Sequence, residues 1–457
     1  MSVEALREQQ AIRRTTEHLV QVFAGTHSAE HVERVMQAAY RRFDGFPVRD
    51  FVPVLAERLA RSELAVRVET NVPAEVDTPE ERPEDVRPET GPVAVKMPGR
   101  KVLIPIGLAV VVAVVVTVVV VNLGQEEPPA PPPLATVRGV IGSEKKAFFE
   151  DPQVVRALAD KGVKVEIETA GSRQIATSTD LGRYDFAFPS SAPAGEYIQR
   201  LRKVGTKYTP FSSPMAIATF QPIADLLTKA GVVKQDAVPA FKIGRHLELV
   251  TTDTKWDQLA DNSVYRVDKD ILISTTDPRT SNSAAMYLAI NSYVANGGKV
   301  VHGATAEKSV LPLVTRLFTS QGYTDNTSEG PFNEYLTVGM GPSPMVWIYE
   351  SQFIDAARQG RLKPGMVLMY PSPTVLSKHT LVPLNADGDR VGRLLSTDPR
   401  LQRLAAEHGF RSGDTGGFAK VAADNKVRVA TDLIDVVDIP SYDTLENLLD
   451  GVAKSYG

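Results

Sequence analysis

Short polar side chains follow one predicted strand after another between residues 136 and 350. Hydrogen-bonding side chains at the end of a strand or the start of a helix include Ser143, Ser172, Arg173, Ser190, Ser191, Ser212, Ser213, Thr280, Ser281, Asn282, Ser283 and Tyr349, with the charged residues Glu144, Lys145 and Glu350 beside them. In an open α/β sheet, ligands bind beyond the carboxyl ends of the strands, where helix N-termini present free N–H groups and the positive end of the helix dipole. Converging loops of this composition predict a binding site for a small polar or anionic ligand.

Each of these positions also has a simpler structural explanation when it is considered alone. Serine or asparagine before a helix is an N-cap by default, and glycine in a strand–helix turn usually supplies a positive φ. Arg173 alone is more often a surface charge than an anion clamp. In the first loop (GSEKK, residues 142–146), a carboxylate from Glu144 that pointed inward would repel an anion. The prediction of a ligand site therefore depends on the convergence of the loops.

Composition and missing motifs exclude several kinds of chemistry. The 457 residues carry a formal net charge of -4, which gives no electrostatic case for nucleic acid. The chain has no cysteine, so it has no disulfide, thiolate metal site or cysteine nucleophile. It contains no G-x-S-x-G elbow, P-loop or H-E-x-x-H motif, and its histidines show no metal-ligand spacing. We predict no catalytic residue, metal or cofactor, although counting acidic residues does not exclude a glycosidase-like carboxylate pair.

Strands and helices alternate from Thr136 onward. The predicted strands cover 136–142, 163–170, 184–190, 209–220, 271–278, 345–350 and 366–373. The predicted helices cover 148–162, 171–178, 193–203, 222–231, 281–295, 351–360 and 401–410. This alternation predicts parallel α/β sheets, and about 320 residues exceed one comfortable core, so two lobes are expected. Residues 413–457 add a further predicted strand at 427–440 and a helix at 444–455, which the resemblance described below does not cover.

The most apolar stretch of the chain, residues 102–123, contains no charged residue. A membrane-spanning helix needs about 20 such residues. A buried core element is the weaker alternative, and the position of the stretch rules out a cleavable signal peptide. Lys96, Arg100 and Lys101 precede it, and Glu126 and Glu127 follow it. The positive-inside bias therefore predicts a single transmembrane helix at 101–123 in the cell (plasma) membrane, with a cytoplasmic N-terminus and an extracytoplasmic C-terminal domain.

Residues 1–65 read as three short helices, each with one apolar stripe. The stretch HVERVMQAAYRRFDGFPVRDFVPVLAERLA, within residues 10–64, resembles an N-terminal three-helix-bundle dimerisation domain of actinobacterial proteins. The resemblance implies an all-α cytoplasmic bundle that forms a homodimer, and a monomeric bundle is the alternative. Residues 66–100 are rich in acid and proline and predict a disordered linker, and 124–135 predict a stiff proline-rich spacer.

Residues 136–412 resemble the type II periplasmic-type solute-binding proteins. The resemblance rests on GSRQIATSTDLGRYDFAFPSS, SSPMAIATF, TTDPRTSNSAAMYLAI and VLMYPSPTVLSKHTLVPL, and on an HGF(R) signature typical of the molybdate and phosphate branch. It implies a ligand held between two lobes, with lobe 1 at about 136–214 and 372–457 and lobe 2 at about 215–371. The resemblance assigns the ligand contacts to nine positions: Ser143, Ser172, Arg173, Ser190, Ser191, Ser281, Asn282, Ser283 and Tyr349. The family's usual lipidated cysteine is missing, and the transmembrane helix takes its role as an anchor.

Three functions are compatible with these features. The first is a membrane-anchored extracytoplasmic solute-binding protein that takes a small polar ligand for uptake or sensing, with a transporter or signalling partner. The second is an interaction adaptor on the same scaffold without a ligand, and the third is an enzyme. An open polar cleft favours the first function, and a cleft filled by its own side chains favours the second. A carboxylate–histidine or paired-carboxylate site within hydrogen-bond reach favours the third.

Overall fold

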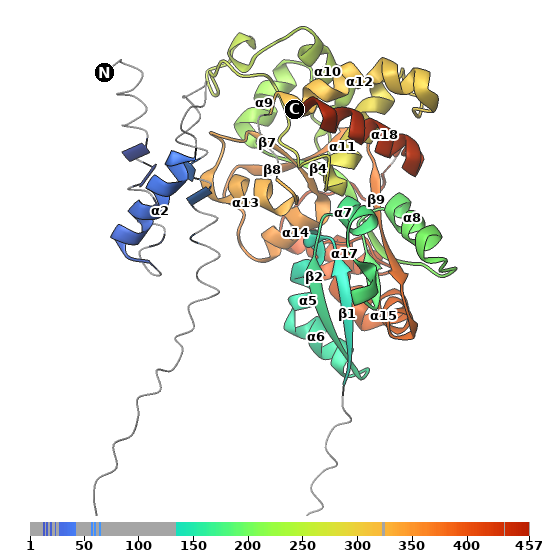
Figure 1. Ribbon diagram of the computed structural model, residues 1–457. Coiled ribbons are helices and arrows are strands. Elements are labelled where there is room, and N and C mark those ends of the chain that lie inside the picture. The colour runs from blue at the N-terminus through green and yellow to red at the C-terminus, as the bar shows by residue number, and fades with distance from the viewer. Residues whose placement is uncertain are drawn as a thin grey trace, which may run out of the picture. The chain divides into compact units, whose positions relative to one another are not determined.

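The computed structural model describes residues 134–321, 325–433 and 435–456, together with 27–42 and isolated positions between 12 and 64 (Figure 1). The chain divides into two compact units, Met1–Val114 and Val115–Gly457. The predicted transmembrane helix, the acidic linker and nearly all of the proline-rich spacer lie outside the described residues and remain predictions. Within the described residues, no helix is both long and apolar enough to cross a membrane.

In the N-terminal unit, helix α2 (Ala29–Arg41) coincides with the second predicted helix. Its N-cap is Ser28, whose side chain accepts a hydrogen bond from the backbone N–H of His31 at 3.3 Å. The helix buries Val32 and Met36 in a small apolar cluster. Described positions of the other two predicted helices add to that cluster: Leu19, Ala56, Ala60 and Leu64. The complete three-helix bundle and its dimer remain predictions.

The larger unit is built on one mixed sheet. Its strand order is β2 (Val163–Thr169), β1 (Ala135–Ile141), β3 (Phe186–Phe188), β9 (Leu376–Pro383), β4 (Tyr208–Phe220), β8 (Met366–Ser372), β6 (Ala240–Lys242) and β5 (Val233–Lys234), and β7 (Met345–Tyr349) also pairs with β4. β1 runs parallel to β2 and β3, whereas β9 is antiparallel to β3 and β4 is antiparallel to β7, β8 and β9. The predicted parallel pairing therefore holds for β1 with β2 and β3 and for β6 with β8. It is wrong for the pairs made by β4 and β9 and for β5 with β6.

β4 divides the sheet into two lobes. From Tyr208 to Pro214 it pairs with β9, and from Met215 to Phe220 it pairs with β7 and β8. β9 in turn continues from β4 to β3 at Val382 and Pro383. We define the first lobe as β1, β2, β3 and β9 with their covering helices, and the second lobe as β5, β6, β7 and β8 with theirs. Only the β4–β9 ladder joins the two halves of the sheet among the described strands.

Side chains alternate between the two faces of the sheet, and in each lobe both faces of the sheet are buried. In β7, Trp347 enters one core and Val346 and Ile348 enter the core on the opposite face. In β3, Phe186 and Ala187 divide in the same way between two smaller cores. Successive strand residues point to opposite faces, and a strand covered on both sides is apolar throughout. Each lobe is thus a sheet between two layers of helices.

Six helices cover the first lobe: α5 (Lys146–Glu150), α6 (Pro152–Ala159), α7 (Ser172–Thr177), α8 (Ala192–Arg202), α15 (Ala386–Thr397) and α16 (Pro399–Glu407). The single helix predicted at 148–162 is divided in two at Asp151. The Asp151 carboxylate accepts a hydrogen bond from the N–H of Gln153 at 2.7 Å, and Pro152 occupies the first turn of α6. Proline lacks the N–H that would continue a helix but suits its first turn, so α6 begins there.

Among the described residues, six helices between β4 and β8 belong to the second lobe: α9 (Gln221–Lys229), α10 (Ile243–Thr251), α11 (Asn282–Ala295), α12 (Gly303–Thr319), α13 (Glu329–Val338) and α14 (Glu350–Arg358). Most of α11 is buried, which makes it the central helix of this lobe. The prediction of a strand at 271–278 is wrong. Ser274 forms only an isolated parallel bridge with Val346, and the residues before and after Ser274 do not pair with β7.

The C-terminal segment contains α17 (Thr415–Asp424) and α18 (Tyr442–Ala453). The strand predicted at 427–440 is absent from the described residues of that segment, where Val436 makes a single bridge to Thr374. α18 packs along α12 and α11 (Figure 1), and it buries Leu445, Leu448 and Val452 in the main core of the second lobe. By its packing, α18 therefore belongs with the second lobe, although the sequence groups it with the first.

Candidate ligand-binding site

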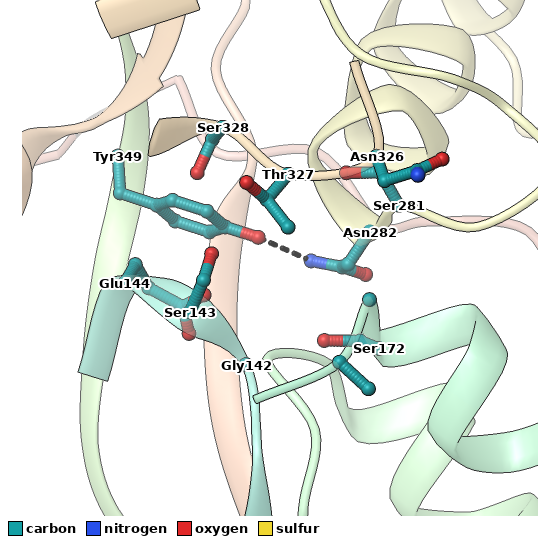
Figure 2. A pocket seen from close by; sticks show the side chains of 12 residues that line it. Gly142, Ser143, Glu144, Ser172, Ser281, Asn282, Asn326, Thr327, Ser328 and Tyr349 are labelled. Carbon is teal, nitrogen blue, oxygen red and sulfur yellow. Dashed lines mark hydrogen bonds between the residues drawn. The ribbon is translucent and has the colours of Figure 1, made fainter. Parts of the chain in front are cut away.

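A small polar cavity lies between the two lobes (Figure 2). Its volume is about 10 Å³, which is room for one water molecule. Its walls are the turn after β1, the turn after β2, the start of α11, the segment before α13 and the end of β7. The lining residues are Gly142, Ser143, Glu144, Ala170, Gly171, Ser172, Ser281, Asn282, Asn326, Thr327, Ser328 and Tyr349.

The structure brings five of the nine predicted positions together at this cavity: Ser143, Ser172, Ser281, Asn282 and Tyr349. Ser190, Ser191, Ser283 and Arg173 do not line it. Residues 326–328 line it but were not predicted. They lie between α12 and α13 and follow no strand of the sheet, so the strand-end pattern had no means of identifying them.

Asn282 and Tyr349 meet at the cavity. The Asn282 amide donates to the Tyr349 hydroxyl at 3.0 Å, as Figure 2 shows, and it also lies 3.3 Å from the carbonyl oxygen of Ser190. Burial and the nearby Glu144 carboxylate raise the pKa of Tyr349 well above its usual value, so the phenol stays protonated. Because Asn282 starts α11 and Ser190 follows β3, this amide connects the two lobes at the floor of the site.

Two of the predicted serines serve as helix N-caps. Ser191 accepts the N–H of Ala194 at 3.3 Å at the start of α8, and Ser281 accepts the N–H of Ser283 at 3.2 Å at the start of α11. Ser281 lines the cavity as well. The Ser283 hydroxyl is buried and has no hydrogen-bond partner within the described residues.

The guanidinium of Arg173 points away from the cavity toward α18. Its Nε donates to both carboxylate oxygens of Glu446, at 3.0 and 2.8 Å, and one terminal nitrogen lies 2.6 Å from Asp450. Its other terminal nitrogen donates to the carbonyl oxygen of Arg279 at 3.0 Å. These bonds use its donors on the protein itself, so Arg173 holds α18 in place and is not positioned as an anion clamp.

A buried charged cluster lies directly behind the cavity wall. Lys145 Nζ contacts Glu144 Oε1 and lies 3.0 Å from Ser190 Oγ and 3.2 Å from His379 Nδ1. The Lys145 side chain has no exposed surface, and that of Glu144 is 4% exposed. Burial lowers the pKa of Lys145, and the Glu144 charge opposes that shift. Burial alone would raise the pKa of Glu144, but Lys145 and His379 outweigh it and hold that pKa far below the ordinary value.

The contact between Glu144 and His379 is the carboxylate–histidine pair that would favour an enzyme. Their Oε1 and Nδ1 atoms are 3.2 Å apart, but the His379 side chain is completely buried and does not line the cavity. Burial and the Lys145 charge lower the pKa of His379 to about 4, so its ring is neutral near pH 7. A histidine without access to the cavity has no path to a substrate, and the pair therefore acts as a structural contact. The described part of the chain contains no group of three or more His, Asp and Glu side chains that could hold a metal ion.

The HGFR signature connects the lobes behind the site. His408 Nε2 lies 2.9 Å from the Asp151 carboxylate, and Phe410 stacks on Phe211 of β4 with ring centroids 4.3 Å apart. Arg411 forms a paired contact with the buried Glu350 carboxylate of α14, at 2.7 Å for both nitrogens. In this chain the signature is part of the packing between lobes, and none of its residues lines the cavity.

No protein-family model and no curated protein matches the chain. Solved structures do resemble it. The sulfate-binding protein SubI of Mycobacterium tuberculosis is 16% identical, with a TM-score of 0.40 over 63% of this chain and 91% of that chain. The periplasmic molybdate-binding protein of Azotobacter vinelandii is 14% identical, with a TM-score of 0.37 over 60% and 98%. A periplasmic thiamin binding protein is 9% identical, with a TM-score of 0.46 over 72% and 99%.

Proposed function

We propose that this chain is a membrane-anchored extracytoplasmic solute-binding protein that takes a small polar ligand between its two lobes, for uptake or sensing. The observation that carries the proposal is the cavity itself. Ser143 and Ser172 reach it from the first lobe, and Asn282 and Tyr349 reach it from the second. Hydroxyl and amide groups that converge from two lobes on one small space can orient a polar solute.

The lobes must separate before a solute larger than water can enter. The cavity holds about 10 Å³, and the halves of the sheet are joined through the β4–β9 ladder. A hinge at the strands that connect two lobes would open the site without disturbing either core. The membrane anchor rests on the charge-free run at 102–123 and on the lysine and arginine residues that precede it.

The small volume favours a second candidate, an interaction adaptor whose cleft is filled by its own side chains. The two functions differ in whether any solute stabilises the protein. We expect thermal unfolding of the full chain, screened against oxyanions, sugars, amino acids and short peptides, to identify at least one stabilising class. A specific ligand at 100 times its Kd adds about 2.7 kcal/mol to the free energy of unfolding.

A matched pair of variants shows whether such a response arises at the cavity. Asn282→Ala removes an amide that lines the cavity, whereas Ser178→Ala changes an exposed hydroxyl at the end of α7. We expect the first variant to weaken ligand stabilisation at least tenfold in apparent affinity and the second to leave it unchanged. A folded full chain that responds to nothing in the panel would favour the adaptor.

A further inference from the structure

A carboxylate of the chain itself occupies the polar centre of the first-lobe side of the site. Glu144 Oε1 accepts hydrogen bonds from Lys145 Nζ and from the Ser190 hydroxyl. The two opposite charges lie side by side in the protein interior, with exposed fractions of 4% and 0% for Glu144 and Lys145. The Lys145 cation is therefore neutralised within the protein before any ligand arrives.

The serine hydroxyls are oriented toward the same carboxylate. Ser172 Oγ accepts the backbone N–H of Ser190 at 2.8 Å, and its own hydrogen is directed to Ser190 Oγ at 3.0 Å. A hydroxyl has one hydrogen to donate, and that of Ser190 goes to Glu144 Oε1. The chain of donors Ser172, Ser190 and Lys145 thus ends on one oxygen atom, as it would end on an anion.

His379 completes the set of partners around Lys145. Its ring is neutral, and its Nδ1 lies 3.2 Å from the lysine ammonium and 3.2 Å from Glu144 Oε1. The Lys145 ammonium is thus surrounded by Glu144, Ser190 and His379 and has no exposed surface.

Glu144 also lines the cavity, where it is the only charged side chain among the lining residues. Its hydrogen bonds from Lys145 and Ser190 are both at Oε1, which leaves Oε2 with capacity to accept another. A second anion beside this carboxylate would meet like-charge repulsion in a water-poor site. A ligand that donates a hydrogen bond or carries positive charge would be attracted.

We infer that Glu144 determines the specificity of the interlobe site: its carboxylate stands where an anionic ligand group would bind, so the protein excludes free oxyanions and carboxylates and selects ligands that present a hydrogen-bond donor or a positive charge. The inference deepens the proposed function and rests on it for the natural ligand. Its physical core, an anion-binding position filled by Glu144, is testable without knowing that ligand.

Removing the carboxylate exposes this position. In Glu144→Ala, the donors of Lys145 and Ser190 converge on the space that Oε1 occupied. Acetate has the same heavy atoms as the part of the side chain that this substitution removes, which makes it the matching probe. The double variant Glu144→Ala/Lys145→Met is the matched control, because it makes the same space without the buried cation.

The test measures acetate and sulfate binding to the full chain in detergent micelles, by thermal unfolding and titration calorimetry, with chloride at equal ionic strength as the reference. We expect Glu144→Ala to melt below the unaltered protein in chloride and to regain stability with acetate in a saturable manner. Acetate should bind this variant at least about a hundredfold more tightly than it binds either the unaltered protein or the double variant.

The other outcomes overturn the inference. It fails if the unaltered protein binds sulfate or acetate within tenfold of the affinity of Glu144→Ala, or if that variant gains no anion response. A single variant that stays unfolded even in acetate, while the double variant folds, also contradicts it, because the exposed lysine would then not be an anion site. The solute panel separates this result from the proposed function. A natural ligand that is an oxyanion refutes only the inference, whereas acetate rescue with no natural ligand refutes only the proposed function.

Discussion

Arg173 and Glu446 form a bidentate ion pair that joins the first lobe to the C-terminal helix α18. Arg173 Nε lies 3.0 and 2.8 Å from the two Glu446 oxygens, and a terminal nitrogen lies 2.7 Å from one of them. Tyr197 of α8 adds a ring stack on Tyr442, with centroids 4.3 Å apart. The opposite face of α18 is buried in the second lobe. α18 is therefore bound to both lobes, and it spans the side of the molecule where they meet.

Replacing Arg173 should loosen this connection. In Arg173→Ala, the Glu446 and Asp450 carboxylates lose a partner that is only 13% exposed, so we expect a loss of about 1–3 kcal/mol in the free energy of unfolding. Urea unfolding of the full chain measures it. Arg183→Ala is the control, because Arg183 is 65% exposed and its pair with Glu168 is long, at 3.6 Å. Surface pairs of that kind contribute little, so equal losses in the two variants would contradict the assigned role of Arg173.

Gly171 allows the two lobes to touch at the rim of the cavity. A Cβ at this position would clash with the carbonyl oxygen of Thr280, which accepts the N–H of Arg173 at 3.1 Å across the same contact. We expect Gly171→Ala to force the lobes apart there and to cost about 1–3 kcal/mol, as overpacking does.

Small-angle X-ray scattering and thermal unfolding test this prediction together. If the two lobes meet at Gly171 and Thr280 in solution, Gly171→Ala should have a larger radius of gyration and a lower Tm than the unaltered protein. Gly205→Ala is the control, because a Cβ added at Gly205 meets no atom within 4 Å. If both variants match the unaltered protein, the lobes do not meet at Gly171 in solution.

Buried His246 should make stability fall in weak acid. Burial lowers its pKa from 6.5 to about 4 in the folded state. Between these two pH values the unfolded chain binds more protons than the folded chain, so stability is full above pH 6.5 and is lost as the pH falls toward 4. The slope from this one group approaches about 1.4 kcal/mol per pH unit.

Two histidine variants isolate this contribution in denaturant titrations from pH 7.5 to 4. His246→Gln retains a donor for the Ile271 carbonyl oxygen, which His246 Nε2 contacts at 2.7 Å, but it removes the titrating ring. We expect a shallower loss of stability in acid for this variant. His302→Gln, at an exposed position, should follow the unaltered protein. An unchanged slope in His246→Gln would show that His246 is not neutral and buried.

The absence of cysteine makes the membrane topology directly testable. Lys203→Cys places one thiol on the exposed end of α8, and Glu30→Cys places one on the exposed face of α2. If residues 124–457 are extracytoplasmic, a membrane-impermeant maleimide should label the first variant in intact cells and the second only after permeabilisation. Labelling both in denaturant confirms that each thiol reacts. The reverse pattern, or equal labelling in intact cells, would refute the predicted orientation.

The sequence anticipated the strands and helices whose side-chain periodicity is undisturbed. β7 alternates between two cores, and α9 and α18 each carry one apolar stripe, so local pattern and packing agree. The segment 271–278 alternates similarly, with Ile271 and Ile273 buried, but only Ser274 reaches a neighbouring strand. Among the helices that the structure describes, five lie where none was predicted: α10, α12, α13, α15 and α17. α12 contains Pro312, which lacks the N–H of a helical hydrogen bond, and packing against the second-lobe core nevertheless maintains the helix.

The cavity residues predicted from the sequence lie at the end of a strand or at the start of a predicted helix. Ser143 and Ser172 follow β1 and β2, and Tyr349 ends β7. Ser281 and Asn282 stand at the start of α11, although the strand predicted before that helix is absent from the described residues. The Arg173 side chain could not be placed in this way, because its partner Glu446 is 273 positions away. The same limit applies to His379, which reaches Lys145 across 234 positions. Contacts of that range depend on the packing of whole helices and strands, which local patterns do not encode.

The pairing of β3 with β9 has a consequence for synthesis of the protein. Ser377 of β9 contacts Ser190, which follows β3, across 187 positions, and most of the second lobe lies between them in the chain. At about 5–20 residues per second, a ribosome needs roughly 10–40 seconds to make that stretch. During this interval β3 has no partner on its β9 side and remains an open strand edge. A chain whose translation stalls before residue 376 would therefore expose the unpaired edge of β3, which can pair with strands of other chains and aggregate. The rate of translation would then affect how much protein folds correctly.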